Sequence, residues 1–388
     1  TWNISTNSGI TARQNGTFGN KTTIKMFNNI YNNKRVLITG HTGFKGSWLA
    51  LWLSKMGANI TGYSLHPPTE PNHFSLLDMV INSIIGDVRD ADKLKQIFEE
   101  QQPEIIFHLA AQPIVRDSYK DPVETFNTNV MGTINVFEAS RMINTVSAIV
   151  NVTSDKCYEN REWPWGYREI DPVGGYDPYS TSKGCSELIT SCWRNSFFNL
   201  KEYGNTHNIL LASGRAGNVI GGGDWATDRL IPDLMRAVNQ NEKVKIRNPQ
   251  ASRPWQHVLE PLSGYLLLGQ KLLEGHRDYA EAWNFGPSED GNATVREIAD
   301  QAKRTWQKNE YEINMNPVQP HEAGMLKLYS SKSNIKMHWA PVWDKKTAVE
   351  KTAQWYKKYY ESNEVQSLDD LYSYIEAAKS MHLSWAEE

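Results

Sequence analysis

The sequence has few cysteines, no long hydrophobic run and no excess of basic residues. Its 388 residues include three cysteines, Cys157, Cys185 and Cys192, with no CxxC pair, which argues against a disulfide framework and a zinc site. No window approaches the roughly 18 uninterrupted apolar residues of a membrane span. Lys and Arg number 41 against 44 Asp and Glu, so the net charge is −3, without the basic footprint of a nucleic-acid or membrane binder. We therefore expect a cytoplasmic protein that acts on a small molecule.

The N-terminal segment has a different composition from the rest of the chain. Residues 1–25 are rich in Thr, Asn, Ser and Gly and contain no acidic residue, and Met26 follows directly. The shortage of acid is also typical of transit peptides, but Arg13 is the only arginine and there is no apolar core. We expect residues 1–33 to form a tag-like or disordered extension.

From Lys34 onward, short β-branched runs alternate with helical periodicity. Arg35–Thr39 predicts a strand, and the apolar stripe from Phe44 to Trp52 predicts the helix after it. Further strand signals lie at 60–64, 84–85, 105–109, 148–153 and 209–212. This alternation predicts an α/β fold, a Rossmann-type doubly wound parallel sheet over 34–218. The chain is less regular over 219–388, where we expect a smaller lobe whose closing helix covers 345–358.

Three glycines, Gly40, Gly43 and Gly46, follow the first predicted strand and open the first predicted helix. Backbone N–H groups at such a helix start can face a pyrophosphate, whereas the alternative is an ordinary tight turn. The GxxGxxG spacing resembles that of the extended short-chain dehydrogenase/reductase family, in its nucleotide-sugar-modifying branch.

The second predicted strand ends in Tyr63-Ser64-Leu65-His66, without the usual ribose-binding carboxylate and without an arginine for a 2′-phosphate, so we predict NAD. Asp87 and Val88 resemble the family's adenine contacts. A helix N-cap region explains these two residues equally well. The resemblance implies a NAD-binding domain over 34–218 and these cofactor contacts: Gly40, Thr42, Gly43, Phe44, Lys45, Gly46, Ser64, Asp87, Val88, Leu109, Ala110, Ala111, Asn129, Tyr179 and Lys183.

Tyr179 and Lys183 lie four residues apart on the helix predicted after Asp177-Pro178. This spacing places them on one helix face, where an ammonium stabilises a phenolate and lowers its pKa. Tyr179 is then a base that removes a hydroxyl proton as hydride leaves the same carbon. A solvated helix face is the alternative.

Ser154, Asp155 and Lys156 end a predicted central strand, at the sheet edge where ligands bind. The resemblance implies that Ser154 hydrogen-bonds the substrate oxygen beside the tyrosine. In sugar-nucleotide 4,6-dehydratases the next two residues are normally Asp and Glu. Here the resemblance assigns Asp155 to protonation of the C6 hydroxyl and Lys156 to the C5 proton, as a base or as a cation that stabilises the enolate. A turn-forming aspartate and a solvated lysine are the alternatives.

Four longer segments, 40–48, 153–163, 215–225 and 253–260, resemble the CDP-glucose-specific branch of these dehydratases. The resemblance implies conversion of CDP-glucose to CDP-4-keto-6-deoxyglucose and water, for the deoxysugars of bacterial surface polysaccharides such as the lipopolysaccharide O-antigen. It implies that no metal is needed. It also implies a substrate-binding lobe, formed mainly by residues 219–388, and a set of substrate contacts. These contacts are Gln112, Asn218, Trp225, Arg229, Arg253 and His257.

Among these, Arg229 and Arg253 suit the pyrophosphate, since guanidinium binds phosphate bidentately, whereas a surface ion pair is the alternative for either. The residues alone do not distinguish cytosine from other bases, so CDP rests on the resemblance. A nucleotide-sugar 4-epimerase would share the glycine turn and the Tyr–Lys pair but has no need of Asp155 and Lys156. A non-catalytic dinucleotide sensor would usually have lost Tyr179 or Lys183. The resemblance further implies a homodimer or homotetramer.

Overall fold

The computed structural model describes residues 23–288, 291–314 and 325–387. Its largest element is a sheet of seven parallel strands in the order β10-β6-β5-β4-β1-β2-β3. Its strands are β1 (Arg35–Thr39), β2 (Asn59–Ser64), β3 (Asn82–Ile85), β4 (Ile105–His108), β5 (Ala148–Val152), β6 (Leu210–Arg215) and β10 (Ala282–Asn284). The chain runs outward from β1 in one direction and from β4 in the other. The boundary between β1 and β4 is the switch point at which doubly wound sheets bind ligands, and the predicted fold class is confirmed.

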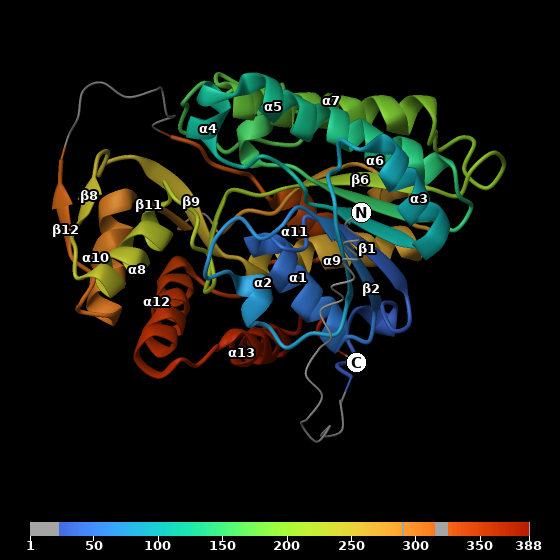
Figure 1. Cartoon of the computed structure of the whole chain (residues 1–388). Coiled ribbons are helices and arrows are strands. Elements are labelled where there is room, and N and C mark those ends of the chain that lie inside the picture. Colours follow the sequence, from blue (N-terminus) through green and yellow to red (C-terminus); the bar gives the residue numbers. More distant parts are fainter. Residues whose placement is uncertain (1–22, 289–290, 315–324, 388) are drawn as a thin grey trace, which may run out of the picture.

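Helices cover both faces of this sheet (Figure 1). Val36 and Ile38 pack in one core with α1, α9 and α13, whereas Leu37 between them packs in another with α3 and α6. Successive strand side chains point to opposite faces, so a continuous apolar strand such as β1 needs helices on both.

The helices are α1 (Phe44–Lys55), α2 (His73–Leu76), α3 (Ala91–Gln101), α4 (Val115–Lys120), α5 (Pro122–Phe126), α6 (Gly132–Arg141), α7 (Pro178–Ser196), α9 (Leu259–Leu273), α11 (Ser331–Met337) and α13 (Ser367–Ser380). Short helical turns are η1 (Phe27–Asn29), η2 (Asn127–Met131), η3 (Asp155–Cys157) and η4 (Arg277–Tyr279).

A smaller lobe, seen at the left of Figure 1, has its own core around Trp225, Leu234, Ile298 and Trp355. Its strands are β7 (Asn218–Ile220), β8 (Val244–Ile246), β9 (Ser252–His257), β11 (Asn292–Thr294) and β12 (Tyr311–Ile313), and its helices are α8 (Leu230–Gln240), α10 (Val295–Thr305) and α12 (Lys345–Ser362). The helix predicted at 345–358 is α12. The division at 218/219 stays a proposal, since α9 and β10 lie beyond it in sequence and pack with the large sheet. In the described part of the chain, no helix is both long and apolar enough to cross a membrane.

The expectation of a disordered extension over residues 1–33 is wrong for residues 23–33. Phe27 is fully buried and stacks on Trp385 with ring centroids 5.2 Å apart, and its backbone N–H donates to the Trp385 carbonyl. The Tyr31 hydroxyl donates to the carbonyl of Leu266. The apolar partners come from the distant C-terminus and α9, so local composition does not reveal the packing. Residues 1–22 lie outside the described residues.

Candidate active site

A cavity of about 1290 Å³ lies at the carboxyl ends of the strands and extends to the smaller lobe. Pockets for one small molecule are typically about 300–1,000 Å³, so this one has room for a cofactor together with a substrate. Its wall includes every predicted site residue except Asn129 and His257. Sequence segments 40–46, 64–66, 86–88, 109–117, 152–156, 216–233 and 244–255 all contribute to it.

The glycine turn between β1 and α1 forms one wall. Gly40 has a φ of +80°, and a Cβ on it would lie 2.8 Å from the backbone nitrogen of Ala110. A Cβ on Gly46 would lie 2.1 Å from the Gly40 carbonyl oxygen. Gly43 caps α1 without a side-chain hydrogen bond, which leaves the first N–H groups of a 12-residue helix facing the cavity. A bare, positively polarised helix start fits the diphosphate of a dinucleotide.

The adenosine end of the predicted site is built from the ends of β2 and β3. The Thr42 hydroxyl lies 2.8 Å from the Ser64 hydroxyl and donates to the Leu65 carbonyl. Asp87 accepts hydrogen bonds from the guanidinium of Arg89, which lowers the pKa of its carboxyl group. Ser64 ends β2 and lines the cavity, and its neighbours at the cavity wall are Leu65, His66 and Pro68.

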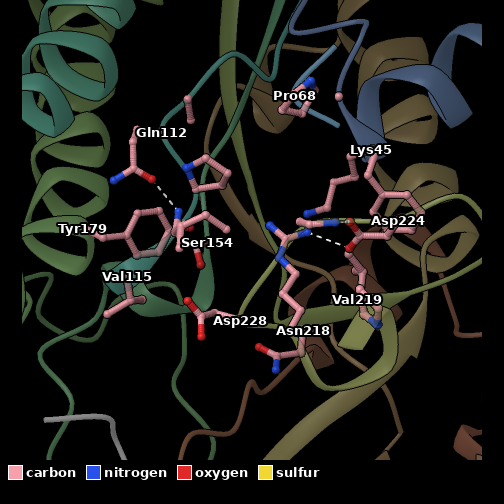
Figure 2. Close-up of a pocket in the computed structure, with 18 of the residues that line it drawn as sticks. Lys45, Pro68, Gln112, Val115, Ser154, Tyr179, Asn218, Val219, Asp224 and Asp228 are labelled. Carbon is pink, nitrogen blue, oxygen red and sulfur yellow. Dashed lines mark hydrogen bonds and ion pairs between the residues drawn. The ribbon is translucent and has the colours of Figure 1, made fainter. Parts of the chain in front are cut away.

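The predicted catalytic groups converge from α7 and from η3, the turn after β5 (Figure 2). α7 begins at Pro178 because Asp177 caps it, accepting from the Ser180 N–H at 2.9 Å. Tyr179 and Lys183 are 8% and 7% exposed, so both are buried at the cavity wall. Tyr179 and Ser154 line the same cavity. Lys156 places its Nζ 5.9 Å from the centre of the Tyr179 ring.

The pKa of Tyr179 differs from the direction that the Tyr–Lys spacing predicts. Burial raises the pKa of Tyr179 to about 12, while the Ser154 hydroxyl acts in the opposite direction. Burial also lowers the pKa of Lys183 to about 8, against the opposing effect of Cys157 and Glu187. The expected lowering is therefore wrong, because the cost of desolvating the phenolate exceeds the attraction of nearby cations.

Asp155 and Lys45 occupy the same part of the cavity. Asp155 is 2% exposed, accepts from the Ser154 hydroxyl at 3.0 Å, and burial raises its carboxyl pKa. A raised pKa suits a group that donates a proton. Burial lowers the pKa of Lys45 to about 8, and the charges of Lys183 and Arg229 act in the same direction. Lys45, expected only as a cofactor contact, therefore belongs to the charged cluster around Asp155.

Four of the six residues predicted for the substrate, Asn218, Trp225, Arg229 and Arg253, line the cavity on the side of the smaller lobe. Asn218 lies on β7 and Arg253 on β9, and Arg229 precedes α8 with its Nη1 2.8 Å from Asp224 Oδ2 (Figure 2). That ion pair raises the pKa of Arg229. Trp225 donates its indole N–H to Tyr360 at 2.9 Å. The predicted Arg229 and Arg253 thus bring to the wall guanidinium groups of the kind that bind phosphate.

Two predicted residues lie behind the cavity wall. Asn129, in η2, accepts from the Gln112 N–H at 2.8 Å and donates to the Ser182 hydroxyl at 2.8 Å, so it connects the loop after β4 to α7. His257 is fully buried between Trp48 and Trp343, and burial lowers its pKa to about 3. The prediction of a direct substrate contact is corrected for His257, which packs in the aromatic core beneath the site.

Several wall residues were not predicted. Asp228 forms ion pairs with both Arg116 and Arg247, at 3.3 and 3.2 Å, and all three side chains line the cavity. These side chains come from α4, the loop before α8 and the segment after β8. Nothing in their local sequence marks them, and only the tertiary fold brings them together.

Comparison with known proteins identifies the family. The family model described as GDP-mannose 4,6-dehydratase matches residues 37–352. The chain belongs to this family. A CDP-glucose 4,6-dehydratase of Salmonella typhimurium is 51% identical over 333 residues, which is 85% of this chain and 92% of the relative. The predicted resemblance to the sugar-nucleotide dehydratase branch is confirmed.

Solved structures show the same fold for this member of the family. The epimerase Mth375 of Methanothermobacter thermautotrophicus superposes with a TM-score of 0.73 at 22% identity and covers 86% of this chain and 95% of its own. A dTDP-glucose 4,6-dehydratase from Bacillus anthracis, solved in complex with NAD, gives 0.67 at 20% identity over 84% and 97%. Epimerases and dehydratases share the fold, so the fold alone does not decide between the two reactions.

Proposed function

We propose that this protein is an NAD-dependent CDP-glucose 4,6-dehydratase, which forms CDP-4-keto-6-deoxyglucose and water. The observation that carries the proposal is the placement of Ser154, Asp155 and Lys156 beside Tyr179 in one cavity. That placement provides groups for hydroxyl oxidation and for loss of water at the neighbouring carbons. The identity of 51% to the Salmonella enzyme supports the choice of CDP-glucose.

The first chemical step is oxidation at C4. Tyr179 removes the proton of the C4 hydroxyl. The Ser154 hydroxyl, which donates to Asp155 in the structure, turns to donate a hydrogen bond to the same substrate oxygen. Lys183, one helical turn from Tyr179, offsets the negative charge that develops on the phenol. NAD supplies the hydride acceptor for C4 and later the hydride donor for C6. The glycine turn and the start of α1 hold its diphosphate.

The second step is loss of water across C5 and C6. Asp155 donates its proton to the departing C6 hydroxyl, a role that its raised pKa favours. Lys156 acts at C5, either taking the proton itself or stabilising the enolate as a cation while water takes the proton. A proton returns to C5 when hydride is delivered to C6. Arg229 and Arg253 bind the substrate diphosphate and thereby hold the sugar against the catalytic turn. In this proposal both steps take place within one cavity.

A 4-epimerase is the competing enzymatic function, since proteins with that activity share the fold. Epimerisation at C4 needs the cofactor and the Tyr–Lys pair but no proton donor at C6. Asp155 is buried in the cavity wall beside Ser154, and burial raises the pKa of its carboxyl group. A carboxyl group of this kind supports dehydration instead.

Purified protein incubated with a panel of NDP-hexoses and NAD+ tests this function. CDP-glucose is expected to give a 4-keto-6-deoxy sugar without net NADH, and deuterium at C4 is expected to reappear at C6. Conversion of UDP-glucose to UDP-galactose, with no keto product from CDP-glucose, would establish the epimerase instead.

The proposal extends to assembly and location. Val123 on α5, Met131 in η2 and Leu188 on α7 are 67%, 46% and 59% exposed, which supports a homodimer formed through these helices. Light scattering on the purified protein tests it, and a monomeric mass refutes it. A nucleotide-sugar substrate and three unpaired cysteines support a cytoplasmic site of action, in bacterial deoxysugar synthesis.

A further inference from the structure

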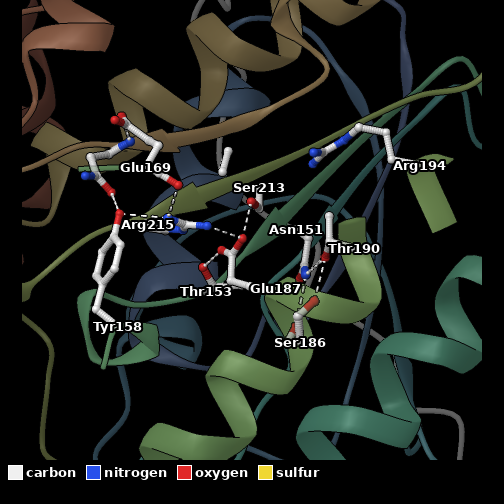
Figure 3. Close-up of polar contacts among 12 residues, drawn as sticks. Asn151, Thr153, Tyr158, Glu169, Ser186, Glu187, Thr190, Arg194, Ser213 and Arg215 are labelled. Atoms are coloured by element: carbon white, nitrogen blue, oxygen red, sulfur yellow. Dashed lines mark hydrogen bonds and ion pairs between the residues drawn. The ribbon is translucent and has the colours of Figure 1, made fainter. Parts of the chain in front are cut away.

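A buried ion pair lies directly behind the catalytic residues, outside the roles assigned above. Glu187 on α7 and Arg215 at the end of β6 are 2.8 Å apart, and each side chain is 4% exposed. Glu187 follows Lys183 by one helical turn. Figure 3 shows its carboxylate between Thr153, Ser213 and Arg215. The Thr153 hydroxyl donates to one carboxylate oxygen, and the Ser213 hydroxyl donates to the other at 2.7 Å.

We call residues 154–157 the catalytic turn. The two members of the ion pair contact the two residues that flank this turn. Thr153, bound by Glu187, immediately precedes the turn. Tyr158, which immediately follows it, accepts a hydrogen bond from Arg215 Nη1 at 2.7 Å. The Tyr158 hydroxyl in turn donates to Asn284 on β10 at 2.7 Å. Ser154, Asp155 and Lys156 therefore lie between two side-chain anchors that a single ion pair joins.

The backbone around the turn reinforces this arrangement. The N–H of Thr153 donates to the Gly214 carbonyl and the N–H of Asp155 donates to the Ala216 carbonyl, each at 3.0 Å. These carbonyls flank Arg215. These two backbone hydrogen bonds hold the end of β6 beside the catalytic turn. They therefore hold Arg215 within reach of both Glu187 and Tyr158.

We propose that the Glu187–Arg215 pair positions the catalytic turn against the helix that bears Tyr179 and Lys183, and so sets the rate of C4 oxidation. The inference rests on the proposed function for its chemistry. Both residues are positioning residues, since neither lines the cavity. The C4 hydroxyl loses its proton as hydride leaves C4, so this hydroxyl must meet Tyr179 and Ser154 at the same time. A displacement of about 1 Å in such a site can cost about a hundredfold in rate.

Glu187→Gln is the decisive variant, because it preserves shape and removes the charge that holds Arg215. Glu260→Gln is the matched control. Glu260 is also fully buried, and it accepts from the backbone N–H groups of Val342 and Trp343 and from Tyr374, none of which adjoins the catalytic turn. Loss of either carboxylate lowers thermal stability, so both variants are assayed well below their unfolding temperatures.

The expected result is a difference between the two variants. Glu187→Gln lowers kcat and the single-turnover rate of NADH formation roughly ten- to a hundredfold, with little change in KM, because the diphosphate contacts at Arg229 and Arg253 are untouched. Glu260→Gln keeps the wild-type rates. Equal rates in Glu187→Gln and wild type, or equal losses in the two variants, overturn the proposal.

A measurement without cofactor or substrate separates this inference from the proposed function. Amide hydrogen exchange in the peptide spanning the catalytic turn is expected to rise in Glu187→Gln and to stay unchanged in Glu260→Gln. If that contrast appears but wild type does not act on CDP-glucose, the positioning holds and the proposed function fails. If wild type is active and the contrast is absent, the positioning fails. Should Glu187→Gln not fold, Tyr158→Phe decides, since it removes only the second anchor; unchanged exchange and kcat in that variant refute the proposal.

Discussion

Replacing Tyr179 by phenylalanine removes one hydroxyl group from the cavity and leaves the ring and its packing in place. Burial raises the pKa of this phenol from 10.0 to about 12. At pH 8 only about one phenol in ten thousand is ionised at that pKa. Tyr179 therefore depends on added positive charge beside it, and loss of the hydroxyl is expected to slow C4 oxidation by about 10²–10⁴-fold.

Single-turnover absorbance of NADH after mixing with CDP-glucose measures that step. Because the base must lose its proton, the wild-type rate is expected to rise with pH through the assay range, and Tyr179→Phe is expected to lose this rise. CDP-glucose binding, measured by calorimetry, is expected to survive, since Arg229 and Arg253 remain. Tyr372→Phe on α13, where the side chain is 42% exposed, is the control and is expected to behave as wild type. An unchanged rate of NADH formation in Tyr179→Phe would remove this residue from the mechanism.

Three further outcomes follow from the site and its surroundings. Lys156→Ala is expected to reduce NAD+ on mixing with CDP-glucose and then accumulate NADH and the 4-keto-hexose intermediate, because Lys156 acts after C4 oxidation; failure to form NADH, or normal turnover, contradicts this role. Fluorescence titration is expected to give a lower Kd for NAD+ than for NADP+, because the wall at Ser64 presents no cation for a 2′-phosphate among the described residues; tighter NADP+ binding would refute that reading. His257 has its pKa lowered to about 3 by burial, so it contributes stability that is present above the unfolded pKa near 6.5 and is lost as the pH falls toward 3. In denaturant unfolding, the loss of free energy between pH 6.5 and 5.0 is expected to be roughly 1.5–2 kcal/mol smaller in His257→Asn than in wild type, and an equal loss in both proteins would contradict it.

Local sequence was enough to predict the parts of the site that depend on spacing along one element. The glycine turn depends on backbone geometry, because there is no room for a Cβ at Gly46. Only glycine meets that requirement, so the requirement can be read from the residue type. The positions of Tyr179 and Lys183 on one face follow from the helical repeat once Asp177-Pro178 starts α7. Strand signals from Arg35 onward predicted a parallel sheet, and its carboxyl edge is where the cavity lies.

The chain by itself therefore determined the fold class, and it predicted the cofactor turn and the candidate catalytic residues, because each pattern lies within a few consecutive residues. Tertiary structure alone decided the burial that reverses the expected pKa shift of Tyr179, the core position of His257 and the packing of Phe27 against Trp385. It also decided the pairing of Glu187 with Arg215, which are 28 residues apart and come from different elements. Desolvation and long-range contacts depend on what the rest of the chain places around a residue, and no local pattern contains that information.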